Sequence, residues 1–347
     1  MLSRREHNAA GADQRAPLDP AAVGHRAVLA VMAGAGASSP DSVALSDLAA
    51  SPQARSAKLH TATLTIAGAS RPVVVKEVGA GGMFPAARAL RTPGVLDACR
   101  EAFVYRDVLG PIPGPPQLLG HQLDADGRAG VLVLERVGGV QLDRVDDLAV
   151  WTDALRWLGR FHATPTARPT PSSVLQSYER RRFAAWAGRA RRVGRARGTS
   201  RRDLDRVVEV FERIGIELVC RAPTTFVHGE LYPSEVVVGA ARADGTIDAQ
   251  RRRIALLDWE TAGIGPALLD VASLLTGSWS GDQRGQLLEA YSSIAPGAGG
   301  EHFDATFAAC RLALALRWMG WLAEQSPADG QTHDWMAEAE DACRYVL

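Results

Sequence analysis

Two acidic residues at the end of an apolar run are the first candidates for chemistry in this sequence. Residues 254–257 read Ile-Ala-Leu-Leu and predict a buried strand that ends at Asp258, and Glu260 follows two positions later. Side chains two positions apart point to the same side of an extended backbone. Carboxylates brought together in this way repel each other unless a cation joins them, so the pattern favours a metal site. Solvated acids at a strand end are the alternative.

Lys76 is the second candidate, because it interrupts the Val-rich run of residues 73–78. Only two of the 39 basic residues are lysines, so arginine supplies nearly all of the ordinary surface charge. An ammonium group on a buried strand is costly unless it is paired. Glu101, on a helix predicted over residues 98–109, is the expected partner. The alternative is an edge-strand lysine whose amine reaches solvent.

A third group of candidates lies in residues 227–235, which read VHGELYPSE. Apolar segments around Phe226 and over residues 236–238 predict a strand on either side of this HGE turn. The run resembles the catalytic loop of aminoglycoside and choline kinases, in which HGD is followed by four residues and an asparagine. The stretch LLDWE, residues 256–260, is similar to the metal-binding segment of the same kinases.

Two further stretches support the resemblance. Residues 263–274, GIGPALLDVASL, are similar to a Gly-Pro…Asp-Leu-Ala stretch of these kinases, and residues 100–109, REAFVYRDVL, surround Glu101. The order of the motifs is preserved over about residues 41–325. In such kinases His228 and Asp270 would brace the catalytic loop.

The resemblance implies an α+β, two-lobed protein-kinase-like fold, and the predicted elements agree with it. Strands dominate up to about Val137, with a hairpin over residues 60–78, and helices dominate afterwards. We therefore expect a disordered tail over residues 1–25, a small N-terminal sheet lobe with one helix over 26–137, and a larger, mainly helical lobe over 138–347.

The resemblance also assigns roles to individual residues. Lys76 and Glu101 would hold the phosphates of ATP, with GTP as a possible substitute. The hinge near Glu135 and Val137 would offer backbone groups to the adenine. The metal ligands would bind Mg²⁺ at the nucleotide phosphates; they are Glu235, Asp258 and Glu260.

Two residues depart from the pattern of the family. Glu230 stands where these kinases have their catalytic Asp, and Glu235 stands where they have a metal-binding Asn. Glu230 keeps a carboxylate that can orient and deprotonate a hydroxyl, but on a longer arm, and a misplacement of about 1 Å can lower the rate on the order of a hundredfold. Glu235 keeps an oxygen ligand and adds negative charge.

The expected function is an ATP-dependent phosphotransferase that moves the γ-phosphoryl group to a hydroxyl of an antibiotic or metabolite. A pseudokinase, which binds nucleotide or regulates without turnover, is the alternative. A nucleic-acid-binding protein is a second rival, because residues 180–206 contain eleven arginines and two acids. A basic face also suits a neutral or anionic acceptor, although a solvated helix face explains it equally well.

Composition narrows the class of protein. The 39 basic and 39 acidic residues balance, which argues against a general nucleic-acid or membrane-surface partner. The four cysteines are far apart, without the spacing of a zinc or redox motif. No apolar run is long enough to cross a bilayer. We expect a cytoplasmic protein with reduced thiols.

Overall fold

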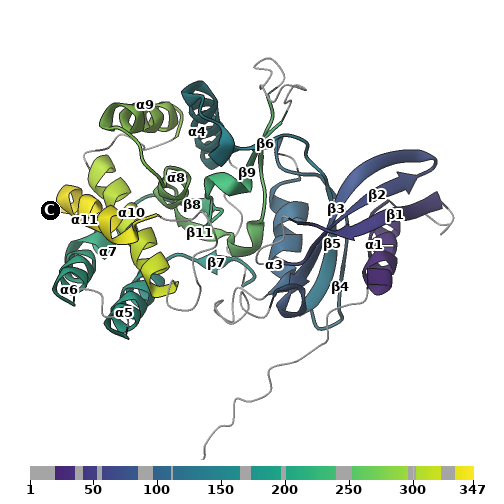
Figure 1. Ribbon diagram of the computed structural model, residues 1–347, viewed down its shortest axis with the longest axis horizontal. Coiled ribbons are helices and arrows are strands. Elements are labelled where there is room, and N and C mark those ends of the chain that lie inside the picture. Colours follow the sequence, from purple (N-terminus) through teal and green to yellow (C-terminus); the bar gives the residue numbers. More distant parts are fainter. Residues whose placement is uncertain are drawn as a thin grey trace, which may run out of the picture. The chain divides into compact units, whose positions relative to one another are not determined.

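The computed structural model divides the chain into two compact units, each of which is described by itself (Figure 1). The first comprises Met1–Arg88, Leu96–Ala98 and Leu119–Val133; the second comprises Ala89–Val95, Cys99–Leu118 and Leu134–Leu347. The residues that the structure describes are 20–35, 42–52, 57–84, 97–110, 112–164, 173–196, 201–239, 252–295, 300, 302–321 and 333–347. The architecture is α+β, as the sequence predicts.

The units differ from the expected boundaries at two points. Helix α1 begins at Pro20, so residues 20–25 of the expected disordered tail are helical, and residues 1–19 lie outside the described part of the chain. The helix that carries Glu101, α3 (Ala98–Phe103) with the π-helical turn Val104–Val108, belongs mostly to the second unit. The sequence predicts this helix in the N-terminal lobe, over residues 26–137.

A five-stranded sheet forms the first unit. Its order is β1-β2-β3-β5-β4, with β1 Val43–Ala50, β2 Leu59–Ile66, β3 Ala69–Gly79, β4 Leu118–Leu123 and β5 Ala129–Glu135. The predicted hairpin is confirmed, since β2 and β3 pair antiparallel from Leu59 opposite Lys76 to Ile66 opposite Ala69. The turn between them is Ala67-Gly68, and both residues have a positive φ.

Helix α1 (Pro20–Ala35) covers one face of this sheet (Figure 1). Its Val23, Ala27 and Ala30 belong to the same core as Val73 and Val75 of β3. A continuous apolar stripe on the helix is thereby matched to alternate residues of the strands. Since neighbouring side chains of a strand point to opposite faces, Lys76 points away from α1.

Helices and two small sheets form the second unit. The helices after α3 are α4 Leu148–Ala163, α5 Arg180–Ala196, α6 Arg201–Val210, α7 Ile216–Arg221, α8 Leu268–Leu274, α9 Gly281–Ser292, α10 Phe303–Trp321 and α11 Trp335–Val346. A π-helical turn, Phe211–Gly215, joins α6 to α7. The strands are β6 Val140–Gln141, β7 Gln176–Ser177, β8 Thr224–Val227, β9 Val236–Val238, β10 Ile254–Leu256 and β11 Gly263–Pro266, in the orders β10-β9-β6 and β7-β11-β8.

Helix α10 packs against α5, α8 and α11 in the second unit (Figure 1). Residues 307–317 of this helix are all buried; nine of these eleven are apolar, and the other two are Arg311 and Arg317. A helix with this pattern is covered on all sides, so both arginines need partners inside the protein. No helix within the described ranges combines the length and hydropathy of a membrane span.

Candidate active site

The HGE turn lies between β8 and β9, and each strand is fixed by a different partner. β8 pairs antiparallel with β11, and β9 pairs antiparallel with β10. The turn therefore joins the two small sheets of the second unit. Strand β10, which ends two residues before Asp258, is the direct neighbour of β9, the strand that follows the turn.

Asp270, fully buried on α8, holds the backbone of the turn. Its Oδ2 accepts from the amide of His228 at 2.7 Å, and its Oδ1 accepts from the amide of Gly229 at 2.8 Å. His162 contacts Oδ2 through Nε2 at 3.3 Å and contacts the Tyr291 hydroxyl through Nδ1 at 2.9 Å. The bracing role that the resemblance implies for Asp270 is thus present as two charge-assisted hydrogen bonds.

His228 connects the turn to the segment of Asp258. Its Nε2 lies 2.6 Å from the carbonyl oxygen of Leu257, which can only accept, so Nε2 carries the proton. Nδ1 can then accept from the amide of Glu230 at 3.4 Å. The Thr261 hydroxyl donates to the His228 carbonyl at 3.0 Å. The turn and residues 257–261 therefore form one hydrogen-bonded unit.

Gly229 is required by the shape of the turn. Its φ is 85°, in the left-handed region. A Cβ built at this position would collide with the Tyr178 hydroxyl and would lie 2.8 Å from the Thr261 carbonyl oxygen. That hydroxyl donates to the same carbonyl at 2.7 Å, and burial raises the pKa of Tyr178, although Arg317 opposes the rise. Tyr178 therefore remains a protonated donor that fills the space a side chain would need.

Glu230 forms an ion pair with Arg317 of α10. Both side chains are largely buried, with 17% of Glu230 and 8% of Arg317 exposed. The guanidinium also donates through Nη1 to the carbonyl of Gly229 at 2.9 Å, and its carbon lies 5.0 Å from the ring centroid of Trp186. The sequence reasoning missed Arg317. The signal was present, because Arg317 interrupts an apolar helical run just as Lys76 interrupts an apolar strand.

Glu235 and Asp258 stand at the same end of β9 and β10. Val236 pairs with Leu256, and one step further the amide of Leu257 donates to the Glu235 carbonyl at 2.8 Å. Asp258 follows directly, in a left-handed conformation with φ 60° and ψ 66°. The two predicted metal ligands therefore lie on neighbouring backbone segments.

Glu260 does not follow Asp258 along an extended backbone, contrary to the expectation from the sequence. The backbone is not extended there, because Asp258 is left-handed and Trp259–Thr261 form a 3-10 turn. Strand alternation therefore does not fix the direction of the Glu260 side chain. Its carbonyl accepts from Arg100 of α3 at 3.0 Å, and only 7% of the residue is exposed.

The acidic residues of the site are suited to a magnesium ion that is bound jointly by protein and nucleotide, and less suited to a metal site formed by protein ligands alone. Among the described residues, His, Cys, Asp and Glu side chains form no group of three or more that could hold a metal ion. Magnesium does not need one, because it commonly binds one or two carboxylates and takes its other ligands from phosphates and water. Glu235 and Asp258 can supply that pair.

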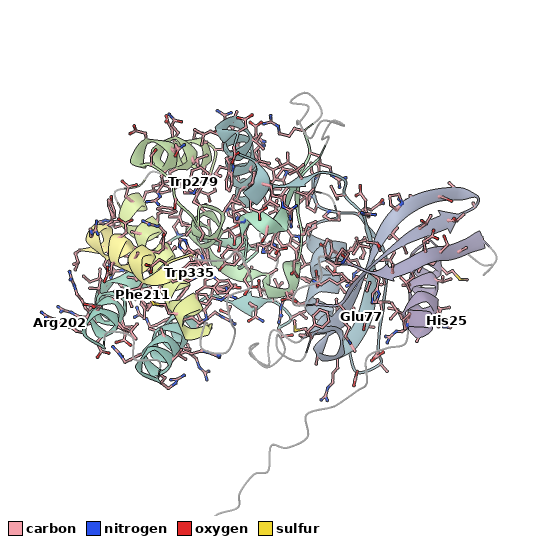
Figure 2. All side chains as sticks on the ribbon, in the orientation of Figure 1. His25, Glu77, Arg202, Phe211, Trp279 and Trp335 are labelled. Carbon is pink, nitrogen blue, oxygen red and sulfur yellow. The ribbon has the colours of Figure 1, made fainter. Side chains whose placement is uncertain are left out.

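Lys76 and Glu101 are both buried, with 4% and 2% exposed. Lys76 belongs to the first unit and Glu101 to the second, so their predicted pairing stays a prediction. Glu77, which is labelled in Figure 2, follows Lys76 on β3, so its side chain points to the opposite face of the strand. There it contacts His60 at 2.9 Å and Lys58 at 3.8 Å. The two lysines of the chain therefore lie on opposite faces of β3.

Glu135 is engaged through its side chain. Arg253 binds its carboxylate at 2.6 and 2.9 Å and also donates to the carbonyls of Gly114 and Pro115, each at 2.9 Å. The hydrogen bond to Glu135 raises the pKa of Arg253. The Glu135 amide donates to Gln117 at 2.9 Å. A nucleotide base that binds at this residue would therefore use its carbonyl oxygen.

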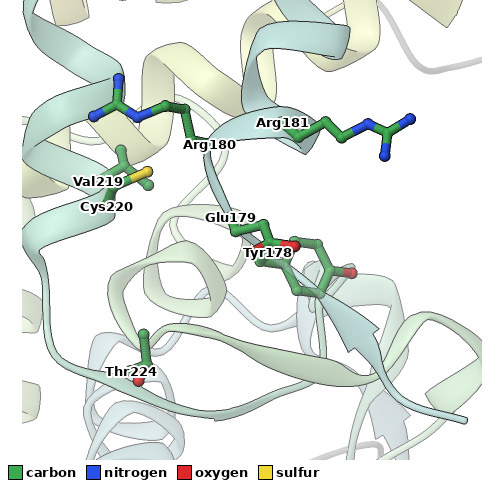
Figure 3. A pocket seen from close by; sticks show the side chains of 7 residues that line it. All are labelled: Tyr178, Glu179, Arg180, Arg181, Val219, Cys220 and Thr224. Carbon is green, nitrogen blue, oxygen red and sulfur yellow. The ribbon is translucent and has the colours of Figure 1, made fainter. Parts of the chain in front are cut away.

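A cavity of about 660 Å³ lies beside Tyr178, at the start of α5 and the end of α7 (Figure 3). It is lined by Tyr178, Glu179, Arg180, Arg181, Val219, Cys220 and Thr224. Arg180 is paired with Glu217, and further along α5 Arg191 is paired with Asp205 and Glu212. These pairs favour the interpretation of the arginine-rich stretch as a solvated helix face.

Comparisons with known proteins agree with this geometry. The model of the phosphotransferase enzyme family (APH) matches residues 96–305. No curated protein sequence matches the chain. Among solved structures, the ethanolamine kinase of Plasmodium vivax has a TM-score of 0.58 at 10% identity, and covers 90% of this chain and 86% of its own.

Two further solved structures are similar. A microcompartment-associated aminopropanol kinase has a TM-score of 0.55 at 14% identity, covering 86% of this chain and 90% of its own. A thermostable mutant of aminoglycoside phosphotransferase APH(4)-Ia, in complex with ADP and hygromycin B, has a TM-score of 0.55 at 15% identity, covering 87% and 95%. At these identities the likeness shows the protein-kinase-like fold. Since the family match spans more than half of the sequence, the chain belongs to the phosphotransferase enzyme family.

Proposed function

We propose that this chain is an ATP-dependent phosphotransferase that moves the γ-phosphoryl group to a hydroxyl of a small molecule. The observation that carries the proposal is the joint fixation of the HGE turn and the Asp258 segment. Hydrogen bonds of His228 and Thr261 join the two segments to each other. Hydrogen bonds to Asp270 fix the turn to the buried helix α8. Phosphoryl transfer depends on such fixed positions more than on covalent help from the protein.

Glu230 is the proposed base. The acceptor hydroxyl oxygen forms a bond to the γ-phosphorus, and the bond from that phosphorus to the bridging oxygen of ADP breaks. The hydroxyl proton goes to the Glu230 carboxylate. Glu235 and Asp258, with Glu260 as a further ligand or water contact, would hold Mg²⁺, which when bound neutralises charge on the phosphates.

The remaining roles follow the sequence prediction. Lys76 and Glu101 would hold the phosphates, and the carbonyl of Glu135 with the amide of Val137 would bind the adenine. GTP is a possible substitute, since a solved structure of aminoglycoside 2'-phosphotransferase-IIIa contains GDP. The similar solved structures are named for aminopropanol and ethanolamine, or contain hygromycin B. We expect the acceptor here to be a small molecule, neutral or anionic, and no nucleic acid.

A pseudokinase is the second candidate, and two observations favour it. Glu230 is paired with a buried cation, and Glu235 replaces the metal-binding Asn of the related kinases. Extra negative charge beside the phosphates weakens nucleotide binding, whereas an ion-paired carboxylate is a weaker base. Both effects lower turnover without removing the fold.

ADP release separates the two candidates. The chain would be assayed with ATP and Mg²⁺ against panels of aminoglycosides, macrolides, nucleosides and amino alcohols. We expect one class to stimulate ADP release, and Mg²⁺ with ATP to raise the melting temperature because only the native state binds it. Lys76→Ala should remove most of that shift. A stable complex with nucleotide but no turnover on any panel would favour the pseudokinase.

A further inference from the structure

Arg317 binds the HGE turn at two points that belong to successive residues. It is paired with the Glu230 carboxylate through Nη2 and donates through Nη1 to the Gly229 carbonyl at 2.9 Å. The face of its guanidinium is covered by Trp186. A guanidinium that is hydrogen-bonded along its edge and covered on its face has little rotational freedom. A carboxylate bound to this guanidinium is therefore also held in one position.

We propose that Arg317 is a positioning residue that fixes the carboxylate of Glu230 for the acceptor hydroxyl. The proposal rests on the proposed function and extends it to a residue on another helix. Glutamate has one more rotatable bond than the aspartate of related kinases, so its carboxylate can be misplaced more easily. The contact to Gly229 ties the guanidinium to the backbone next to Glu230, and the carboxylate is thereby placed relative to its own turn.

The neighbouring residue of α10 also binds this loop. The indole of Trp318 donates to the Tyr232 hydroxyl, and the two rings lie 5.5 Å apart. Trp318 in turn stacks on Trp335 of α11 with ring centroids 5.5 Å apart, and Trp335 is labelled in Figure 2. Two successive residues of one helix therefore contact the loop on both sides of Leu231. This arrangement makes α10 the rigid element that fixes the loop around Glu230.

The ion pair between Arg317 and Glu230 would also be explained if Arg317 only neutralised a buried carboxylate. That role predicts a loss of stability on substitution without a specific loss of turnover. Arg311, six residues earlier on α10, is the matched control. It is equally buried, and it binds Glu338 at 2.6 Å and Asp341 at 2.8 Å on α11, away from the HGE turn.

The test compares Arg317→Lys with Arg311→Lys. Both variants keep the charge and lose the fork, so both should lower the melting temperature. Only Arg317→Lys should lower kcat, by about 10- to 100-fold, because the carboxylate loses its fixed position. The Kd of Mg²⁺–ATP, measured by calorimetry, should stay unchanged in both. Equal kcat values in the two variants would overturn the proposal.

A double variant tests whether Arg317 acts through Glu230. In the Glu230→Gln background the Arg317→Lys change should add no further loss of kcat, since the group to be positioned is gone. Losses that multiply would contradict the proposal, because Arg317 would then act on something else.

Glu230→Asp supplies a test that does not depend on the folding of Arg317 variants. The shorter arm cannot stay on a guanidinium that is fixed by Gly229 and Trp186, so kcat should fall below that of the parent chain. A kcat equal to the parent's or higher would overturn the positioning role. A parent chain without turnover on any acceptor would instead remove the proposed function, and this inference with it.

Discussion

Arg311 and Arg317 are two buried arginines of one helix, and both are paired with carboxylates. Arg311 joins α10 to α11 through Glu338 and Asp341, so both ends of its ion pairs lie on helices. Arg317 joins α10 to a turn, through Glu230 and the carbonyl of Gly229. Burial and pairing are therefore the same for both arginines, and the difference lies in the backbone that carries the partner: a regular helix for Arg311 and a tight turn for Arg317.

The two regions also differ in how their backbone is held. The α11 partners stand on a regular helix whose own hydrogen bonds fix it, and Asp334 caps its first turn. The HGE turn has a residue with φ 85° and depends on Asp270, Thr261 and Tyr178 for its shape. Glycine adopts this conformation without strain, but any other residue there would be strained, so the shape of the turn depends on Gly229 and on the hydrogen bonds around it.

The largest expected difference between the regions is in turnover. Glu230→Gln keeps the size of the side chain and removes the carboxylate, so kcat should fall by about 10²- to 10⁴-fold, the usual effect of a positioned general base. Glu338→Gln makes the same chemical change in the α11 region and should leave kcat within about twofold, on the expectation that an interaction remote from the reacting atoms adds little to catalysis. Steady-state ADP release with a true acceptor measures both. Equal losses would show that the comparison is mistaken.

A second difference concerns the backbone. Gly229→Ala forces a left-handed conformation, which costs about 1–3 kcal/mol, and adds a collision with Tyr178. Gly285→Ala is the control, because Gly285 lies in α9 with nothing within 4 Å of an added Cβ. That change should stabilise the protein by about 0.5–1 kcal/mol. Urea unfolding measures both, and a neutral Gly229→Ala would contradict the described shape of the turn.

The smallest expected effect is on acid stability, and it belongs to the α11 region. Burial opposes ionisation of Glu338, but hydrogen bonds from His333 and Arg311 outweigh it and lower its pKa from 4.5 to about 2. A lowered carboxyl pKa stabilises the fold above pH 4.5, and this contribution, at most about 3 kcal/mol, is lost as the pH falls toward 2.

Glu338→Gln should therefore flatten the dependence of unfolding free energy on pH between 4.5 and 2. Chemical denaturation at a series of pH values measures the slope. Glu338 is one of several carboxylates in the protein, so the slope should shrink without vanishing. An unchanged slope would show that Glu338 is not the responsible group.

Much of the fold could be predicted because it rests on local patterns. The alternation in residues 60–66, the Ala67-Gly68 turn and the Val-rich run with Lys76 specify a hairpin whatever surrounds them. The apolar stripe of residues 151–161 likewise appears as α4. The strands on either side of the HGE turn, and a third strand that ends two residues before Asp258, also follow from the order of apolar and polar residues.

The partners of the site residues could not be predicted in the same way. Arg317 lies 88 positions from Gly229, and Asp270 lies 41 positions from it. Periodicity shows that both residues are buried on helices, but it does not show what faces them. Periodicity also does not show that the backbone of Asp258 is left-handed. For this reason the expected direction of the Glu260 side chain, which assumed an extended backbone, does not follow.

The sequence by itself therefore determined the local helices and strands of this protein and on which of them the candidate site residues stand. The hydrogen bonds of a turn and the apolar face of a helix or strand depend on residues that are close together in the sequence, so the sequence alone predicts them. Only the tertiary structure decided that Arg317 binds Glu230 while Arg311 binds α11. Two arginines six positions apart on one helix point in different directions, and the packing of α10 against its neighbours determines what each one meets.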